Sequence, residues 1–424
     1  MARRFRWLIP LATAVLVLAA CTPSSSGSSK TVTVIGTWTD AEQAAFLAMV
    51  KPWETESGNT VKYQGTRSIN DILAAGVPTG VLPDLAGLPG PGQMAEYAAA
   101  GALQPLDEVL DVATYTSETS PALVALGKSA ADGKTYGVFI KAALKGLIYY
   151  NPTLHDYAAS PPATWDDLVS QGNANKGSAD ALWCVGISSG DASGWPATDW
   201  IENILLRQSG PDVYNDWWAG KVKWTDPKVK AAFDVYKEVV DNSYGGGTNV
   251  VATKFELAGD PLFANPPGCE FFEQANFMSG LGKFKTLKAG VDFNAFPFPA
   301  INPDFTKAVE GAGDLFGMFH ATDAAKSLMK YLVTAEAQDI WVKAGGALSA
   351  NKNATSYPDD FSKNAGAAVA NAEQFVFDAS DLMPSAMNAA FWSHMVSLTN
   401  GDETVDEALE ALQKAAVDAY KPAT

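Results

Sequence analysis

Cysteine, histidine and basic residues are all scarce in this chain of 424 residues. Three Cys exclude a disulfide-dense scaffold and a multi-cysteine zinc or iron–sulfur protein. His155, His320 and His394 lie far apart, so we expect no metal site, and without an H-E-x-x-H or P-loop sequence we expect no cofactor. Lys and Arg number 30 against 47 Asp and Glu, which argues against nucleic acid, because phosphate neutralisation needs clustered basic side chains.

The composition that remains is that of a well-filled globular protein. Hydrophobic residues make up 47% of the chain and charged residues 18%, which is enough apolar material to bury a core. At roughly 100–200 residues per domain, the length predicts two or three folding units. No internal repeat occurs, and the chain has no second apolar run that approaches the roughly 20 residues needed to span a membrane.

The first twenty residues are predicted to be a secretion signal. Three Arg in the first six residues precede an apolar run over residues 7–20, which is too short for a membrane span. The run ends in Leu18–Cys21, the pattern of a bacterial lipobox, so we expect Cys21 to carry a lipid that anchors the protein to the outer face of the cytoplasmic membrane. Residues 21–30 are predicted to be a flexible, polar tether. The alternative is an ordinary signal peptide followed by a chance Cys.

Two further cysteines remain once Cys21 is assigned to the lipid. Outside the cytoplasm a lone pair of thiols usually oxidises, so Cys184 and Cys269 are candidates for a disulfide. The bond would close a loop of about 85 residues, which the chain-entropy model values at about 4–5 kcal/mol. Two unpaired buried Cys are the alternative.

Strand and helix patterns alternate along the chain. The β-branched run Thr31–Ile35 predicts a buried strand, and Phe46, Met49, Val50 and Trp53 share one face of the helix expected after it. Further strands are predicted near 61–63, 82–86, 136–140 and 146–150, and further helices near 93–100, after Thr164, after Asp226, and over 323–344 and 404–420. This order predicts an α/β fold with helices on both faces of the sheet.

Taken in order, the motifs of the chain resemble a known family. Asp84 after Pro83, Ala102–Leu106, Tyr149–Pro152 and Pro162–Leu168 resemble extracellular solute-binding proteins of ATP-binding-cassette importers, in the carbohydrate branch that includes maltose-binding proteins. A second set is similar to the α-glucoside-binding subgroup: Trp183–Ile187, Gly194–Glu202, Leu205–Arg207, Gly210–Pro211, Pro267–Cys269, Gln274–Ala275, Gly311–Asp314 and Phe377–Pro384. The likeness covers nearly all of residues 31–424 and lies in order and spacing, not in one motif.

The resemblance implies an α/β, two-lobed fold of the maltose-binding-protein type, with a cleft between the lobes and a strand hinge. It places residues 31–140 and about 302–345 in an N-terminal lobe, residues 145–297 and about 346–424 in a C-terminal lobe, and the hinge near 140–148 and 293–303. It also implies that Cys184 and Cys269 are bonded. The expected partners are an α-glucoside-like carbohydrate and the transmembrane subunits of a permease, and we expect a monomer that touches the membrane only through its lipid.

The residues themselves suggest which side chains meet a sugar. Aromatic rings cover the apolar faces of sugars, and charged or amide side chains bond their hydroxyls. Trp38 follows a predicted strand at the edge where α/β proteins bind ligands, Trp195 lies between Gly194 and Pro196 in a predicted loop, and Trp392 follows an acidic segment. We predict these three as ring platforms, although most Trp residues in any protein are structural.

The polar candidates are distributed over both predicted lobes. In the first lobe they are Arg67 and Asp84, which follow predicted strands, and Glu42, which is in the first turn of a helix and has a surface role as its alternative. Lys145 precedes a hinge strand, with Lys141 as its rival. The remaining candidates are Asp199 and Gln274 in the second lobe, Asp314 in a Gly-rich run predicted as a turn beside the cleft, and Asp381, which is either a ligand acceptor or a helix cap.

Two other classes of function compete with an importer component. A secreted hydrolase that acts on carbohydrates would also be acidic and rich in Trp, and it needs only two carboxylates about 5–10 Å apart. With 47 acidic residues such a pair can always be nominated, so the count does not discriminate. A surface lipoprotein that binds carbohydrate without transporting it is the other alternative. We expect no enzymatic activity.

Overall fold

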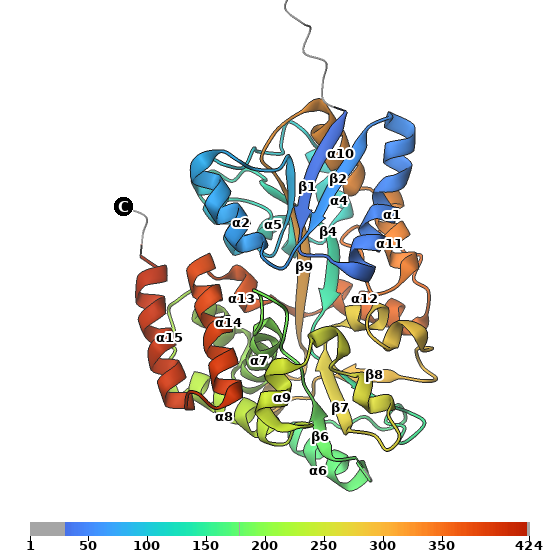
Figure 1. Cartoon of the computed structure of the whole chain (residues 1–424), viewed down its shortest axis with the longest axis vertical. Helices are drawn as coiled ribbons and strands as arrows, with labels where there is room; N and C mark the ends of the chain where they lie inside the picture. Colours follow the sequence, from blue (N-terminus) through green and yellow to red (C-terminus); the bar gives the residue numbers. More distant parts are fainter. Residues whose placement is uncertain (1–29, 178, 422–424) are drawn as a thin grey trace, which may run out of the picture.

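The computed structural model describes residues 30–177 and 179–421, and its strands form two sheets, one in each of two lobes (Figure 1). The predicted signal peptide and Cys21 lie outside the described residues. The first sheet contains β1 (Thr31–Gly36), β2 (Thr60–Gly65), β3 (Leu85–Leu88), β4 (Gly137–Leu144), β9 (Ala308–Met318) and β10 (Gln374–Phe377). The second contains β5 (Leu147–Tyr150), β6 (Ala181–Cys184), β7 (Cys269–Gln274) and β8 (Asn294–Pro297).

The first sheet is mixed, and its parallel part follows the predicted strand–helix–strand order. β1 pairs in parallel with β2 and β3, whereas β9 runs antiparallel to both β3 and β4. The predicted helix after β1 is α1 (Asp40–Ser57), and the predicted face of Phe46, Met49, Val50 and Trp53 is buried, as expected. α1 ends where Gly58 adopts a left-handed conformation that suits a residue without Cβ.

The other helices of the described chain are distributed over both lobes. They are α2 (Ile69–Gly76), α3 (Pro91–Ala99), α4 (Val112–Glu118), α5 (Pro121–Leu126), α6 (Trp165–Asn175), α7 (Trp195–Trp218), α8 (Pro227–Asp241), α9 (Gly246–Ala252), α10 (Asp323–Leu332), α11 (Ala335–Ala344), α12 (Asp360–Ala370), α13 (Ala379–Leu382), α14 (Ser385–Asn400) and α15 (Val405–Ala419). Short 3-10 turns occur at 77–79, 255–257, 260–263, 276–280, 284–286 and 303–305. No helix in the described ranges has the length and apolar character of a membrane span.

The sequence signals for helix starts act as predicted. The side chains of Thr164 and Asp226 each accept a hydrogen bond from a backbone N–H in the first turn of α6 and α8. The single helix predicted over 323–344 is instead two helices, because the Thr334 hydroxyl accepts a hydrogen bond from the N–H of Ala337 and starts α11. The strand predicted near 82–86 lies slightly later, at Leu85–Leu88.

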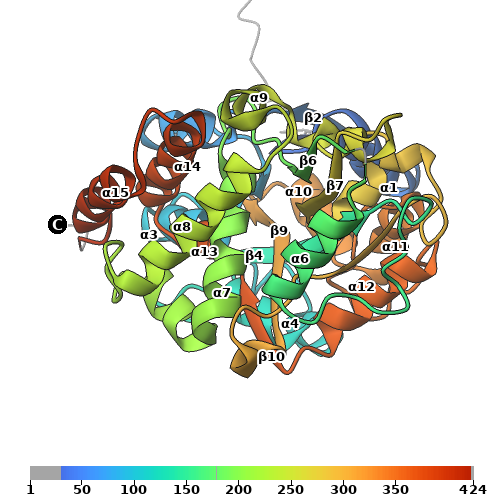
Figure 2. The same cartoon turned by 90° about the horizontal axis from the view of Figure 1, so that it is seen from below.

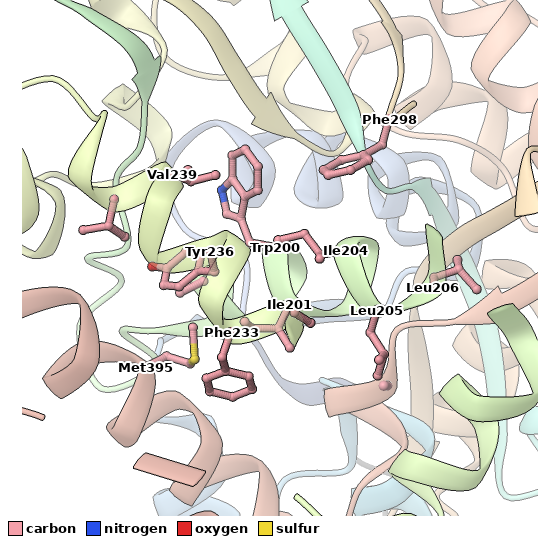
Figure 3. Packing of buried hydrophobic residues seen from close by; sticks show 14 of the residues in the cluster. Trp200, Ile201, Ile204, Leu205, Leu206, Phe233, Tyr236, Val239, Phe298 and Met395 are labelled. Atoms are coloured by element: carbon pink, nitrogen blue, oxygen red, sulfur yellow. The ribbon is translucent and has the colours of Figure 1, made fainter. Parts of the chain in front are cut away.

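The core of the second lobe is rich in aromatic side chains. Trp200, Ile201, Ile204 and Leu205 lie along α7 and pack among side chains of α8 and α14 (Figure 3). Each large apolar side chain buried in this way contributes roughly 1.5–3 kcal/mol relative to an exposed one. Seen from below, α6, α7 and α8 lie nearer to the viewer than β4 and β9 (Figure 2). The predicted disulfide is present: Cys184 and Cys269 link β6 and β7 with a Cα–Cα distance of 5.5 Å.

The chain passes from one lobe to the other at the end of β4. Lys145 and Gly146 connect β4 of the first sheet to β5 of the second, and the segment after β8 leads back to β9. Gly146 has a φ of 66°, and a Cβ on it would lie 2.1 Å from Oδ1 of Asn203, so the crossing requires glycine. The domain boundaries remain predictions, with one difference: β10 pairs with β9 in the first sheet, although residues 346–424 were predicted in the C-terminal lobe.

Candidate ligand-binding site

A cleft opens between the lobes beside this crossing, and it contains a cavity of about 900 Å³ measured to its open mouth. Its floor is made by the small residues Ala143, Ala312 and Gly313, on β4 and β9. Successive side chains on a strand point to opposite faces, so Lys141 lies on the same side of β4 as Ala143, and it lines the cavity. Lys145, which directly follows β4, lines the cavity as well.

Lys141 holds two carboxylates of the first lobe. Its Nζ lies 2.6 Å from Oε1 of Glu42 and 3.5 Å from Oδ2 of Asp314. Burial alone would lower the pKa of Lys141, but the two acids outweigh burial and raise it. Burial alone would raise the pKa of Glu42, yet Lys141 and Arg67 hold it below its ordinary value. We name these three residues the Lys141 cluster.

Lys145 forms a second set of the same kind. Its Nζ lies 2.7 Å from Oδ2 of Asp199 and 2.9 Å from Oδ2 of Asp378, and all three side chains are buried. Burial raises the pKa of Asp199 to about 7 in spite of the nearby lysine. Burial alone would also raise the pKa of Asp378, but Lys145 holds it below its ordinary value. We name these three residues the Lys145 cluster.

One face of α7 supports the Lys145 cluster. Trp195, Asp199 and Glu202 are spaced four and three residues apart, which places them on the same side of the helix. Glu202 is fully buried, and its two carboxyl oxygens accept hydrogen bonds from the N–H groups of Ala379 (3.0 Å) and Ser380 (3.1 Å). Glu202 therefore fixes the segment that carries Asp378 and Asp381 into the cavity.

Arg67 closes the cleft from the first lobe. Its Nη2 lies 3.8 Å from Glu42 of the same lobe and 3.8 Å from Oε1 of Glu256 in the second lobe. The neighbouring hydroxyl of Ser68 donates a hydrogen bond to the carboxylate of Asp191, which also belongs to the second lobe. The described structure is therefore a form in which the two lobes meet across the cleft.

Three tryptophans line the cavity, and they differ in how much ring surface they offer. Trp38 is 2% exposed and its ring stacks on Phe316, so it has less surface for a sugar than we predicted. Trp195 is the first residue of α7 and does not lie in a loop; the ammonium of Lys145 lies 5.0 Å from the centre of its ring. Trp392 is 9% exposed, and its Nε1 has no hydrogen-bond partner among the described residues.

The structure brings most of the predicted side chains to this cavity and leaves two of them elsewhere. The predicted residues that line it are Trp38, Glu42, Arg67, Lys145, Trp195, Asp199, Asp314, Asp381 and Trp392. Asp314 lies within β9 and not in a turn. Asp381 lines the cavity, and the cap of α13 is Asp378.

Asp84 and Gln274 do not line the cavity. Asp84 precedes β3 instead of following a strand, and its Oδ2 accepts hydrogen bonds from the N–H and the hydroxyl of Thr33, both at 2.8 Å. It therefore joins β1 to β3 at the far end of the sheet. Gln274 is 2% exposed, and its side-chain oxygen accepts a hydrogen bond from the N–H of Ala275. Both residues have structural roles here.

Several lining residues were not among the predicted contacts. Lys141, which was kept only as a rival to Lys145, lines the cavity together with it, and strand alternation was the signal that would have included both. Asp378 lines the cavity and has a capping role as well. Phe255 and Phe277 lie in short 3-10 turns, where no periodic pattern marks a residue as facing a cleft.

Two lobes of α/β structure that meet over a polar, aromatic cavity define a binding protein of the two-lobed solute-receptor class. Solved structures of this class share the fold: a bacterial solute receptor named AcbH has a TM-score of 0.77 at 22% identity, covering 92% of this chain and 97% of that one. A chitin oligosaccharide binding protein has a TM-score of 0.78, also at 22% identity, covering 92% of this chain and 99% of that one. At this identity the likeness concerns the fold alone.

Sequence comparison identifies the family. The family model for bacterial extracellular solute-binding proteins matches residues 48–371. The osmoprotective compounds-binding protein GgtB of Synechocystis sp. is 34% identical over 415 residues, which cover 94% of this chain and 96% of the relative. The alpha-glucosides-binding periplasmic protein AglE of Rhizobium meliloti is 30% identical, covering 91% and 87%. This chain belongs to the bacterial extracellular solute-binding proteins.

Proposed function

We propose that this protein is the sugar-binding component of an ATP-binding-cassette importer, and that it captures an α-glucoside or a similar di- or oligosaccharide. The observation that carries the proposal is the cavity between the lobes, in which paired charges and tryptophan rings from both lobes face one space. The relatives AglE, an alpha-glucosides-binding protein, and GgtB, an osmoprotective compounds-binding protein, support this ligand class. A few side chains decide which sugar fits.

The cavity offers the two kinds of contact that a sugar needs. Trp195 and Trp392 present ring surface to the apolar C–H face of a pyranose. Asp381 has no ion-pair partner among the described side chains and is free to accept from hydroxyl groups, while Lys141 and Lys145 are donors held in place by their acids. Since these groups come from both lobes, the ligand favours the closed arrangement by contacts that it makes only there.

The proposed transport role also involves Cys21, which lies outside the described residues, and a membrane partner. We propose that Cys21 carries a lipid that holds the protein at the outer face of the cytoplasmic membrane, as its lipobox sequence suggests. The loaded, closed form would then deliver the sugar unchanged to the transmembrane subunits of the permease. Mass spectrometry of the membrane fraction, comparing the wild type with Cys21→Ser, tests the anchor: a diacylglycerol adduct is expected only on the wild type.

A carbohydrate-active hydrolase is the alternative function for this site. Gly186–Gly190 has the G-x-S-x-G pattern of α/β-hydrolases, but Ser188 lies in extended backbone bridged to Lys254 and not at a strand-to-helix turn. No described hydrogen bond joins Ser188 to a histidine, and His394 is bonded to Glu403 instead. In the cavity, Asp199 and Asp378 are both held by Lys145, so neither is free as a nucleophile.

One experiment separates binding from catalysis. Isothermal titration calorimetry of the mature protein against glucose, maltose, trehalose, sucrose and maltotriose, with tryptophan fluorescence in parallel, measures capture. We expect at least one of the α-glucosides to bind and to change the fluorescence, with the sugar recovered intact after overnight incubation. Steady release of glucose by the purified protein would contradict the proposal in favour of a hydrolase, and a complete lack of binding would remove it.

A further inference from the structure

A second hollow adjoins the cavity on the side of α2 and α14. It measures about 800 Å³ to its open mouth, and it lies between the two lobes. Its polar wall is made by hydroxyl and carboxylate side chains, namely Ser68, Asp71, Asp191, Ser193, Ser393 and Ser397. We call this hollow the α2–α14 groove.

Trp392 lies between the cavity and the groove, because its side chain lines both. The residue is nine-tenths buried, and its Nε1 is a buried donor without a partner among the described residues. A buried N–H without an acceptor costs free energy comparable to a lost hydrogen bond, unless water or a ligand accepts from it. The indole therefore places a ring at the boundary between the two hollows.

The cleft has another mouth, on the opposite side of Arg67, and its chemistry is different. This mouth is lined mainly by charged side chains, among them Asp40, Lys254, Asp260 and Lys283, and none of its lining residues is aromatic. Strongly hydrated charges without a ring surface are a poor match for the apolar face of a sugar. Of these two openings, the α2–α14 groove is the one that combines a ring with hydroxyl groups and carboxylates. A further hollow beside Phe277 and Trp341 also adjoins the cavity and has rings, but most of its lining is Ala and Gly.

The groove also depends on the meeting of the lobes. Ser68 and Asp71 belong to the first lobe, and Asp191 and Ser393 belong to the second. The hydrogen bond that Ser68 donates to Asp191 crosses between them at the groove. A ligand that occupies the groove therefore touches both lobes and adds to the contacts that favour closure.

We propose that the α2–α14 groove is a second glycosyl subsite: a sugar bound in the cavity continues past Trp392 and places its next ring in the groove. This inference rests on the proposed sugar-binding function and adds the direction and extent of the ligand. One ring lies in the cavity by the Lys145 cluster, and the following ring packs on the outer side of Trp392. Its hydroxyls bond to Asp71, Asp191 and the serines of α14.

The test blocks each opening of the cleft in turn with a bulky side chain and measures the affinity for sugars of different length. Ser393→Trp places a bulky ring in the groove from an exposed position of α14, and Leu257→Trp does the same at the charged mouth from a half-exposed position. Calorimetry of the wild type and both variants is performed with glucose, maltose, trehalose and maltotriose, and thermal melts confirm that each variant is folded. Ser397→Trp is the second groove variant if Ser393→Trp does not fold.

We expect the groove variant to bind the preferred di- or trisaccharide at least tenfold more weakly and to bind glucose as the wild type does, while Leu257→Trp changes neither. The inference is overturned if Leu257→Trp is the variant that blocks the longer sugar, if the groove variant weakens glucose equally, or if no wild-type ligand is tighter than glucose. All three outcomes leave a sugar-binding function standing, although the third contradicts the proposed preference for di- and oligosaccharides. If the wild type binds no sugar, the proposed function itself fails, and this inference fails with it.

Discussion

The two lysine clusters of the cavity look alike but are built differently. The Lys141 cluster lies within the first lobe, with Glu42 on α1 and Asp314 on β9. The Lys145 cluster stands at the crossing between the lobes and joins α7 to the start of α13. The carboxylate of Asp314 is one-quarter exposed, whereas those of Asp199 and Asp378 are almost fully buried. The lysine–carboxylate pairs are therefore partly hydrated in the Lys141 cluster and buried away from water in the Lys145 cluster.

The two clusters should differ most in the free energy of unfolding that is lost when their lysine is replaced. Lys145→Met leaves two buried carboxylates without a counter-charge, and loss of one partner of a buried ion pair costs about 3–5 kcal/mol. Lys141→Met should cost less, because water can reach Asp314. Urea unfolding of both variants at pH 7 measures the difference. Equal losses for the two lysines would show that burial does not separate the clusters.

Removal of the carboxyl group behind the Lys145 cluster should have the next largest effect. Glu202→Leu leaves the N–H groups of Ala379 and Ser380 buried without an acceptor, which costs about 1–3 kcal/mol for each group. Burial raises the pKa of Glu202 well above its ordinary value, and Glu202→Gln is a control of similar shape that keeps one of the two acceptor oxygens. Thermal melts and sugar affinity are measured together. A Gln variant as damaged as the Leu variant would show that the retained acceptor oxygen does not preserve this contact.

The clusters should also differ in their dependence on pH. The pKa of Asp199 is raised from about 4 in the unfolded chain to about 7, so the folded state binds the extra proton between these values. Stability therefore falls as the pH rises from about 4 to 7, by up to about 1.4 kcal/mol per pH unit for one proton. Urea unfolding of the wild type between pH 5 and pH 8 should show this slope.

Asp199→Asn supplies the control, because it removes the titrating group and should flatten the slope by up to one proton. Other acids with a raised pKa, such as Asp314, retain their share of the dependence in this variant. A slope that is the same in the wild type and in Asp199→Asn would contradict the assignment to the Lys145 cluster.

The smallest effect is expected at the partly exposed ion pair that joins the two lobes. Glu256→Gln removes the ion pair with Arg67, whose atoms are 3.8 Å apart and partly exposed. Exposed pairs contribute about 0.2–1 kcal/mol, so ligand affinity should fall by a factor of about 1.4 to 5, mainly through faster release. Calorimetry at low and high salt measures this, with Lys254→Gln as the control. A loss that is unchanged by salt would argue against an electrostatic contact.

Several predicted contact residues that line the cavity lie next to a clear element boundary. Trp195 and Asp199 lie at the start of a helix marked by Gly and Pro, and Lys145 lies where one strand passes to the next. Asp84 was misplaced because β3 begins three residues later than the predicted strand, which moves its carboxylate to the opposite end of the sheet. A shift of a few residues is within the usual error of strand boundaries.

Asp314 shows a different limit. Its Gly-rich surroundings predict a turn, but Gly313 is needed inside β9 because a Cβ there would lie 2.8 Å from the carbonyl oxygen of Lys141. Such a requirement depends on a partner strand that is distant in sequence. Phe255 and Phe277 could not be predicted for the same reason, since only the folded chain brings their turns to the cleft.

The connection between the lobes at Lys145 and Gly146 limits how this protein can evolve. Lys145 and Gly146 form the passage between the lobes, and Lys145 also lines the cavity. A mutation that stiffens or lengthens this passage also displaces the ammonium group beside it. Related proteins that evolve a new ligand specificity are therefore expected to keep Lys145 and Gly146 and to vary the surrounding loops. The connection between the lobes is then conserved while the specificity changes.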